Sequence, residues 1–178
     1  MKGLVHIYEG TGKGKSTAGV GLTIRCAGNG FPVVYSQFLK DGTTGEMNIL
    51  RKIPRVERYL LPLVEEHHFG FSFLMTPEEK VEAKAAYTAL FEKVKAAAVE
   101  QNARLLVMDE MLDLCNAELI DTAMVVDFLK NRPEQLEVVM TGRNPKPELV
   151  ELADYITNMN AVKHPFEKGV PARKGIEM

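Results

Sequence analysis

The sequence predicts an α/β fold in which a parallel sheet is covered by helices on both of its faces. Short apolar segments rich in valine, isoleucine and leucine alternate along the chain with segments of helical period. Polar, glycine-rich or charged residues directly follow three of the apolar segments. Ligands of such sheets bind at the carboxyl ends of the strands, so these residues are expected to meet in one site.

The first part of the chain is expected to hold three strands and two helices. The expected strands are 3–8, 32–38 and 55–61, and the expected helices are 16–30, which ends at Gly28–Gly30, and 47–53. A loop at 41–46 precedes the second helix. Residues 62–75 have no clear period and are expected to form a longer loop.

The longest helix is expected at residues 76–101. Thr76 can cap its N-terminus, Pro77 suits its first position, and Glu79 completes a capping box. Four apolar residues then fall on one face: Leu90, Phe91, Val94 and Ala98. Strands are expected at 103–110, 136–143 and 155–160, helices at 119–133 and 147–153, and an irregular tail at 161–178.

Length and composition indicate one globular domain over residues 1–178. The chain is long enough to bury a core, and a net charge of −2 argues against a large nucleic-acid surface. No apolar run of about 18 residues is present, so no membrane span is expected, and the N-terminus does not read as a secretory signal. Cys26 and Cys115 stand far apart, which favours a reducing, cytoplasmic compartment.

The segment GTGKGKST at residues 10–17 is typical of a phosphate-binding loop between a strand and a helix. Its glycines expose backbone N–H groups to an anion, Lys13 and Lys15 add positive charge, and the Ser16 hydroxyl can ligate Mg²⁺. This predicts a P-loop NTPase-like, RecA-like version of the α/β fold. The usual pattern has four residues between its glycines, whereas Gly10 and Gly14 are separated by three, and Glu9 stands where the first glycine is expected.

A second polar group follows the strand expected at 103–110. Asp109 and Glu110 are candidates to hold Mg²⁺ (or Mn²⁺) beside the phosphates, directly or through water. Thr141–Gly142–Arg143 ends the next strand. Arg143 either contacts phosphates or is a surface arginine, and its spacing alone leaves both interpretations open.

Several stretches in one order resemble the P-loop type of corrinoid adenosyltransferase. They are GTGKGKST, SQFLK followed by GE, FGFSF, MDE, TGRN, ELADY and VKHPFEKGVPARKGIE, and they run from near residue 3 to the C-terminus. The family's glycine loop itself has the form G-x-G-K-G-K-[ST], so the short spacing is a family trait. The resemblance implies that Co(I) of a reduced corrinoid attacks the 5′ carbon of ATP, forming a Co–C bond and releasing triphosphate.

The resemblance also implies a set of site residues. ATP and its triphosphate would be bound by Gly10, Thr11, Gly12, Lys13, Gly14, Lys15, Ser16, Thr17 and Arg143, with the metal on Ser16, Asp109 and Glu110. Because Co(I) is already a strong nucleophile, the protein needs no general base and must instead position C5′ and stabilise charge on the leaving triphosphate. The expected catalytic residues are Lys15, Phe71 and Phe73.

Phe71 and Phe73 match the aromatic pair that the family places against the lower face of the corrin. Apolar rings cannot ligate cobalt, so they would remove its axial ligand and ease reduction of Co(II). From the residues alone, a loop tucked into the core is the simpler interpretation of these aromatics. Some members have Trp at position 73, which leaves open how completely the ligand is displaced here. Lys163 and His164 are expected to contact either corrinoid side chains or the nucleotide, or to have a purely structural role.

The family also implies a homodimer and a reduced flavin or flavoprotein as electron donor, with no nucleic-acid or membrane partner. Two other functions are open on the sequence. One is an ordinary P-loop kinase or NTPase, which would release ADP or phosphate. The other is a regulator that binds nucleotide or corrinoid without turnover. Thr11 and Glu9 depart from residues common in relatives, and a carboxylate at position 9 would be unfavourable beside a triphosphate unless it points away.

Overall fold

The computed structural model describes residues 2–40, 42–61 and 75–177. Within them, six strands form one sheet in the order β3-β2-β4-β5-β1-β6, and every neighbouring pair is parallel. The strands are β1 (Val5–Glu9), β2 (Val33–Gln37), β3 (Val56–Leu60), β4 (Leu105–Asp109), β5 (Glu137–Gly142) and β6 (Tyr155–Asn158). All six expected strands are thereby confirmed, and their carboxyl ends share one edge.

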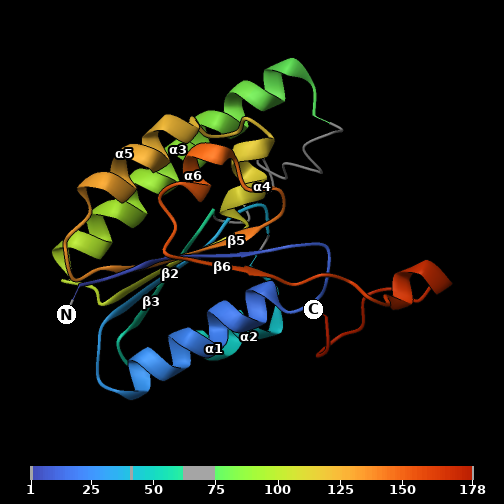
Figure 1. Ribbon diagram of the computed structural model, residues 1–178, viewed down its shortest axis with the longest axis horizontal. Helices are drawn as coiled ribbons and strands as arrows, with labels where there is room; N and C mark the ends of the chain where they lie inside the picture. The colour runs from blue at the N-terminus through green and yellow to red at the C-terminus, as the bar shows by residue number, and fades with distance from the viewer. Residues whose placement is uncertain (1, 41, 62–74, 178) are drawn as a thin grey trace.

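Helices cover both faces of the sheet, as the alternation of segments predicted (Figure 1). On one face lie α1 (Lys15–Gly28) and α2 (Gly45–Leu50). On the other face lie α3 (Pro77–Glu100), α4 (Met111–Asn116), α5 (Thr122–Asn131) and α6 (Pro147–Val150). The crossover from β1 to β2 therefore uses one face, and the crossovers that lead to β4 and β5 use the other.

Alternate residues of the central strands pack into two separate hydrophobic cores, one on each face of the sheet. In β4, Leu105 and Val107 pack in the cluster beneath α1 and α2, while Leu106 and Met108 belong to the larger cluster beneath α3, α4 and α5. All four are at most 1% exposed. A strand buried on both faces explains why this segment is uniformly apolar, and it makes the carboxyl end of β4 a rigid support for the residues after it.

The capping box expected at the start of α3 is present. The Thr76 side chain accepts from Glu79 N, and a Glu79 carboxylate oxygen accepts from Thr76 N. The predicted apolar face of this helix is buried, with Leu90, Phe91, Val94 and Ala98 all at most 4% exposed. Local capping and long-range packing thus agree on where this helix begins and which face it buries.

Several boundaries differ from the sequence prediction. The helix α4 was not predicted, because six residues cannot show a helical period. The helix α2 begins at Gly45, inside the expected loop, and α6 is shorter than 147–153. A 3₁₀ turn, η2 (Pro165–Lys168), interrupts the expected irregular tail. Among the described residues, no helix is both long and apolar enough to cross a membrane.

Candidate nucleotide and metal site

The loop between β1 and α1 is closed by the chain that follows β6. Gly12 N donates to the carbonyl oxygen of Met159 at 2.6 Å. A Cβ atom on Gly10 or Gly12 would lie 2.6 or 2.5 Å from the same oxygen. Gly10 and Gly14 also have φ values of 120° and 118°, which side chains rarely allow. The close approach of the Met159 carbonyl and the positive φ values therefore explain why glycines stand at positions 10, 12 and 14 of the shortened motif.

Lys15 is the first residue of α1 and folds back over this loop. Its Nζ donates to the carbonyl oxygens of Gly10 at 2.8 Å and Gly12 at 2.9 Å. The helix is preceded by Gly14, which offers no side-chain cap, and it carries no acidic residue in its first turn. Its first N–H groups and the positive end of its dipole therefore favour an anion at the loop.

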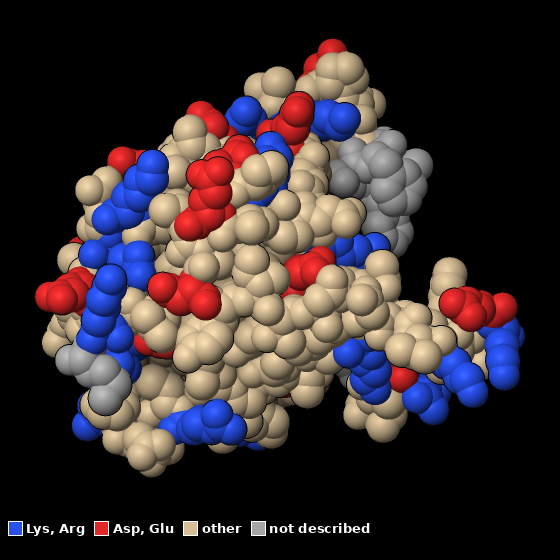
Figure 2. Space-filling model, in the orientation of Figure 1, with Lys and Arg blue, Asp and Glu red and all other residues tan. Residues whose placement is uncertain are grey.

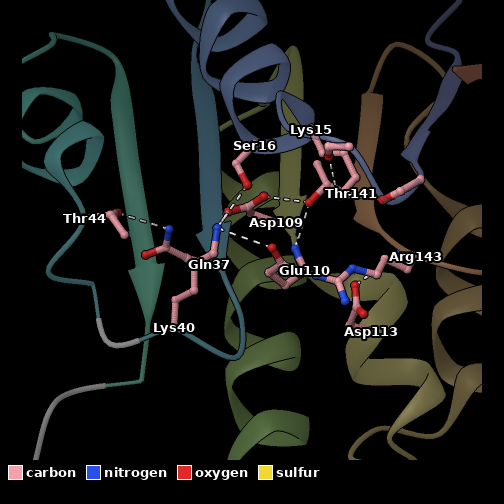
Figure 3. Close-up of polar contacts among 12 residues, drawn as sticks. Lys15, Ser16, Gln37, Lys40, Thr44, Asp109, Glu110, Asp113, Thr141 and Arg143 are labelled. Carbon is pink, nitrogen blue, oxygen red and sulfur yellow. Dashed lines mark hydrogen bonds and ion pairs between the residues drawn. The ribbon is translucent and has the colours of Figure 1, made fainter. Parts of the chain in front are cut away.

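Oxygen atoms from two elements converge on the ammonium of Lys40, a residue that follows β2 (Figure 3). Lys40 Nζ lies 2.7 Å from Asp109 Oδ2 and 3.0 Å from Ser16 Oγ. Glu110 Oε1 lies 3.4 Å from the same nitrogen. Asp109 is fully buried at the end of β4, whereas Lys40 and Glu110 are about one quarter exposed, at 24% and 23%. The three residues predicted to hold a metal are therefore within reach of one cation.

Thr141 at the end of β5 fixes both acidic residues. Its Oγ1 donates to Asp109 Oδ1 at 2.6 Å and accepts from Glu110 N at 2.9 Å. Glu110 has φ 64°, a left-handed conformation that is uncommon for a residue with a side chain. This conformation separates the end of β4 from the start of α4. The hydrogen bond from Glu110 N to Thr141 Oγ1 therefore holds Glu110 in this left-handed turn just before α4.

Arg143 follows β5 at the same edge and is exposed. Its backbone N donates to Asp113 Oδ2 at 2.9 Å, and Figure 3 shows its side chain extending beside Asp113 and toward Glu110. Gly142 allows this contact, because a Cβ atom there would lie 2.5 Å from the same carboxylate oxygen. The turn presents Arg143 next to the cluster without burying its guanidinium.

The Glu9 carboxylate is bonded to the strand beside the phosphate loop. Its Oε1 accepts from the Asn158 amide on the neighbouring strand β6, and its carbonyl oxygen accepts from Met159 N at 2.8 Å. Thr11 turns to the same segment, where its Oγ1 accepts from Ala161 N at 3.4 Å. The two departures from the usual loop residues therefore both contact the chain after β6, which explains how a carboxylate is tolerated at position 9.

A cleft of about 440 Å³ opens beside the loop. Ser16, Thr17 and Lys40 line one part of it, and the segment Gly175–Glu177 lines another. Lys13 Nζ lies 3.5 Å from Glu177 Oε1, so the C-terminal segment reaches the loop lysine. Figure 2 shows that the chain after β6 projects from the body and carries several basic side chains.

The two tail residues singled out in the sequence lie in this projecting segment. Lys163 is exposed, and the His164 ring accepts from Phe166 N at 3.3 Å to cap η2. Phe71 and Phe73 lie outside the described residues. The contact described for His164 does not reach the cluster around Lys40.

Burial and neighbouring charges shift the ionisation of the cluster. Burial lowers the pKa of Lys40, but the charges of Asp109 and Glu110 outweigh it and the net pKa is raised. Burial raises the pKa of Glu110, and Asp109 and Asp113 add to this effect while Lys40 opposes it. Burial also lowers the pKa of Lys15. These opposed shifts in adjoining groups are typical of functional sites.

The family model described as ATP:corrinoid adenosyltransferase BtuR/CobO/CobP matches residues 1–178. The chain belongs to this family. A corrinoid adenosyltransferase of a Sinorhizobium species is 34% identical over 178 residues, covering 99% of this chain and 80% of that protein. Proteins with the same description from Pseudomonas aeruginosa and Escherichia coli are each 30% identical, covering 99% of this chain and 84% and 86% of theirs.

Solved structures show the fold of this adenosyltransferase. The EssC protein (ATPases 2 and 3) of Geobacillus thermodenitrificans superposes with a TM-score of 0.50 at 16% identity, over 98% of this chain and 36% of its own. The EccC protein (ATPases 2 and 3) of Thermomonospora curvata superposes with a TM-score of 0.52 at 16% identity, over 97% of this chain and 35% of its own. The expected P-loop ATPase-like fold is therefore confirmed, and at this identity nothing beyond the fold is carried over.

Two residues of the candidate site had no role assigned from the sequence. Lys40 lies three residues beyond the end of β2, and Thr141 lies in the expected strand that precedes Arg143. Both obey the rule that ligand-binding groups gather at the carboxyl ends of parallel strands. The sequence had already placed Thr141 at a strand end, and applying the rule to the strand expected at 32–38 would have found Lys40 as well, although not the contacts that the two residues make.

Proposed function

We propose that this corrinoid adenosyltransferase uses the site around Lys15, Ser16 and Asp109 to bind ATP and to transfer its 5′-deoxyadenosyl group to cobalt. In this reaction the Co(I) electron pair forms a bond to C5′, the bond from C5′ to the phosphate oxygen breaks, and its electron pair leaves on triphosphate. The observation that carries the proposal is the convergence of a phosphate loop, a hydroxyl and two carboxylates at one sheet edge, in a chain that the family model matches throughout.

The residues of the loop would hold the leaving group. Lys13 and Lys15 provide two positive charges, and Gly14, Ser16 and Thr17 lie where backbone N–H groups can meet phosphate oxygens, whereas Gly12 N is already bonded to Met159. Arg143 would approach from the end of β5. Because charge builds up on the triphosphate as the bond breaks, cations fixed beforehand stabilise the transition state more than the ground state.

The donor set fits Mg²⁺ or Mn²⁺. Ser16 Oγ, Asp109 Oδ2 and Glu110 Oε1 already surround one cation, the Lys40 ammonium, and hard divalent ions prefer such oxygen ligands. When bound, the metal would supply positive charge to the phosphate oxygens. Among the described residues, no group of three His, Cys, Asp or Glu side chains could hold a metal. Phosphate oxygens would therefore complete the coordination.

The corrinoid side of the site is proposed from the family resemblance. Phe71 and Phe73 would press against the lower face of the corrin and exclude an axial ligand, which eases reduction of Co(II). Lys163 and His164 would contact corrinoid side chains. A reduced flavin or flavoprotein would supply the electron, and the protein would act as a cytoplasmic homodimer, with residues 1–178 forming one catalytic domain.

A single assay separates this function from its two rivals. The protein is mixed with ATP, Mg²⁺ and chemically reduced cobalamin, and the corrinoid spectrum is followed before and after exposure to light. Adenosyl transfer gives a light-sensitive product that requires both substrates. ADP without an alkylated corrinoid would instead indicate a kinase or NTPase, and binding of both ligands without any product would indicate a regulator.

A further inference from the structure

Lys40 occupies the place where the proposed metal would bind. Its Nζ is within 2.7 to 3.4 Å of Asp109 Oδ2, Ser16 Oγ and Glu110 Oε1. Mg²⁺ requires oxygen ligands at about 2.0–2.1 Å in octahedral geometry. The ammonium and a divalent ion would then lie almost in contact, where two positive charges repel strongly. The oxygen atoms can therefore hold either cation but not both.

The Asp109 carboxylate is fixed, whereas the Lys40 side chain has room to move. Asp109 is fully buried and is bonded through its other oxygen to Thr141 at 2.6 Å. The backbone before Lys40 is anchored, because Phe38 is fully buried and its N donates to the carbonyl oxygen of Asp109 at 3.0 Å. The Lys40 side chain itself is 24% exposed and lines the 440 Å³ cleft. A flexible four-carbon stem allows the ammonium to turn into that cleft.

Charge balance decides when the exchange is favourable. A buried carboxylate such as Asp109 needs a cation beside it, and Lys40 supplies one without any metal. A metal ion that binds alone must break the ion pair between Lys40 and Asp109, and the Lys40 ammonium then has no other anion beside it. A metal arriving with a triphosphate brings oxygen atoms that can accept the displaced ammonium. On this argument, metal binding would depend on the nucleotide.

We propose that Lys40 is an exchangeable counter-ion of the metal site, which a divalent cation replaces only when a triphosphate arrives with it. Lys40 is in this sense a positioning residue: it keeps Ser16, Asp109 and Glu110 arranged around one positive charge and then transfers its own charge toward the phosphates. The inference rests on the proposed metal site, so its test must separate the two.

The test measures Mn²⁺ affinity by the electron paramagnetic resonance signal of free Mn²⁺, with and without ATP. The proteins are wild type, Lys40→Met and Lys40→Gln, with Lys52→Met as control. Lys52 is an exposed lysine two residues beyond the end of α2, and its loss removes the same charge. Circular dichroism establishes that each variant is folded. Without nucleotide, both Lys40 variants should bind Mn²⁺ at least about tenfold more tightly than wild type and Lys52→Met.

Wild type should also bind Mn²⁺ at least about tenfold more tightly with ATP than without it, and both Lys40 variants should lose most of this difference. Equal affinities of wild type and the Lys40 variants without ATP would overturn the inference and leave the metal site intact. The same holds if wild type binds Mn²⁺ equally well with and without ATP. If Asp109→Asn leaves ATP-dependent Mn²⁺ binding unchanged, the proposed metal site fails, and the inference fails with it.

Discussion

Thr141 Oγ1 donates a hydrogen bond to Asp109 Oδ1 at 2.6 Å, and both side chains are fully buried. The same oxygen accepts from Glu110 N at 2.9 Å, so one hydroxyl on β5 positions the two carboxylates that follow β4. Neither bond is local in sequence. The geometry of the proposed metal site therefore depends on how two neighbouring strands pair, and it should be sensitive to a change that leaves the carboxylates themselves untouched.

Thr141→Val keeps the shape of the side chain and removes both hydrogen bonds. We expect the free energy of unfolding to fall by about 1–3 kcal/mol, because a buried carboxylate oxygen and a backbone N–H lose their partner. Affinity for Mg²⁺–ATP should fall as well. Urea denaturation and nucleotide titration measure the two effects.

Thr23→Val is the matched control for this change. Thr23 is also fully buried, but its hydroxyl donates to the carbonyl oxygen of Gly19 one turn earlier in α1. That carbonyl has a partner in the helix, so the loss of stability should be smaller and nucleotide affinity unchanged. If Thr141→Val and Thr23→Val behave alike in both measurements, Thr141 has no special role in the site.

Gly12→Ala should disrupt the phosphate loop. The added Cβ would meet the Met159 carbonyl oxygen at 2.5 Å and strain the 2.6 Å bond from Gly12 N to that oxygen. Backbone must move to relieve the overlap, so ATP affinity should fall at least about tenfold, or 1.4 kcal/mol. Isothermal titration with ATP provides the measurement.

The control for the loop is Gly21→Ala, on an exposed position of α1 where a new Cβ meets no atom within 4 Å. Alanine should stabilise the helix there by about 0.5–1 kcal/mol and leave ATP affinity unchanged. An unchanged affinity in Gly12→Ala would show that Met159 does not fix the loop.

Phe71→Ala should separate reduction from transfer. If the ring removes an axial ligand from cobalt, its loss should slow turnover from Co(II) at least about tenfold more than turnover from pre-reduced Co(I). Phe31→Ala is the control, because Phe31 is an exposed aromatic residue, 48% accessible, between α1 and β2. Equal losses in both assays would assign Phe71 a structural role only.

The two thiols should differ from free cysteine in reactivity. Burial raises the pKa of Cys115 to about 11, and Cys115 is fully buried, while burial also raises the pKa of the partly buried Cys26. At pH 8 the Cys115 thiolate is therefore a minor species, on the order of one molecule in a thousand. Iodoacetamide should label neither thiol quickly in the native protein, Cys115 slowest, and both quickly in urea. Rapid native labelling of Cys115 would contradict the packing of α4.

The sheet and most of its helices could be predicted because their signals are local or periodic. The apolar run 103–110 ends in carboxylates, and the Thr76–Glu79 capping box marks a helix start within four residues. The helix α4 could not be predicted in this way. It begins after a left-handed Glu110, which is held by a threonine 31 positions away in the sequence.

The sequence singled out several residues that the structure brings together, and their roles in binding stay predictions. The order of strand, glycine loop and helix singled out Lys15 and Ser16, and the carboxyl end of the apolar segment 103–110 singled out Asp109. That Lys40 would lie between Ser16 and Asp109 depends on the pairing of β2 with β4, which sequence alone does not reveal. The contact of Glu9 with Asn158 likewise depends on β6 lying beside β1.

The most direct test of adenosyl transfer at this site tracks both ends of ATP in one reaction. ATP labelled with ¹⁴C in the adenine and with ³²P in the terminal phosphate is incubated with the protein, Mg²⁺ and reduced cobalamin. We expect the ¹⁴C to move to the corrinoid in a light-sensitive bond and the ³²P to be released as intact triphosphate, in equal amounts. Recovery of ¹⁴C in ADP, with ³²P in phosphate or in another acceptor, would contradict adenosyl transfer.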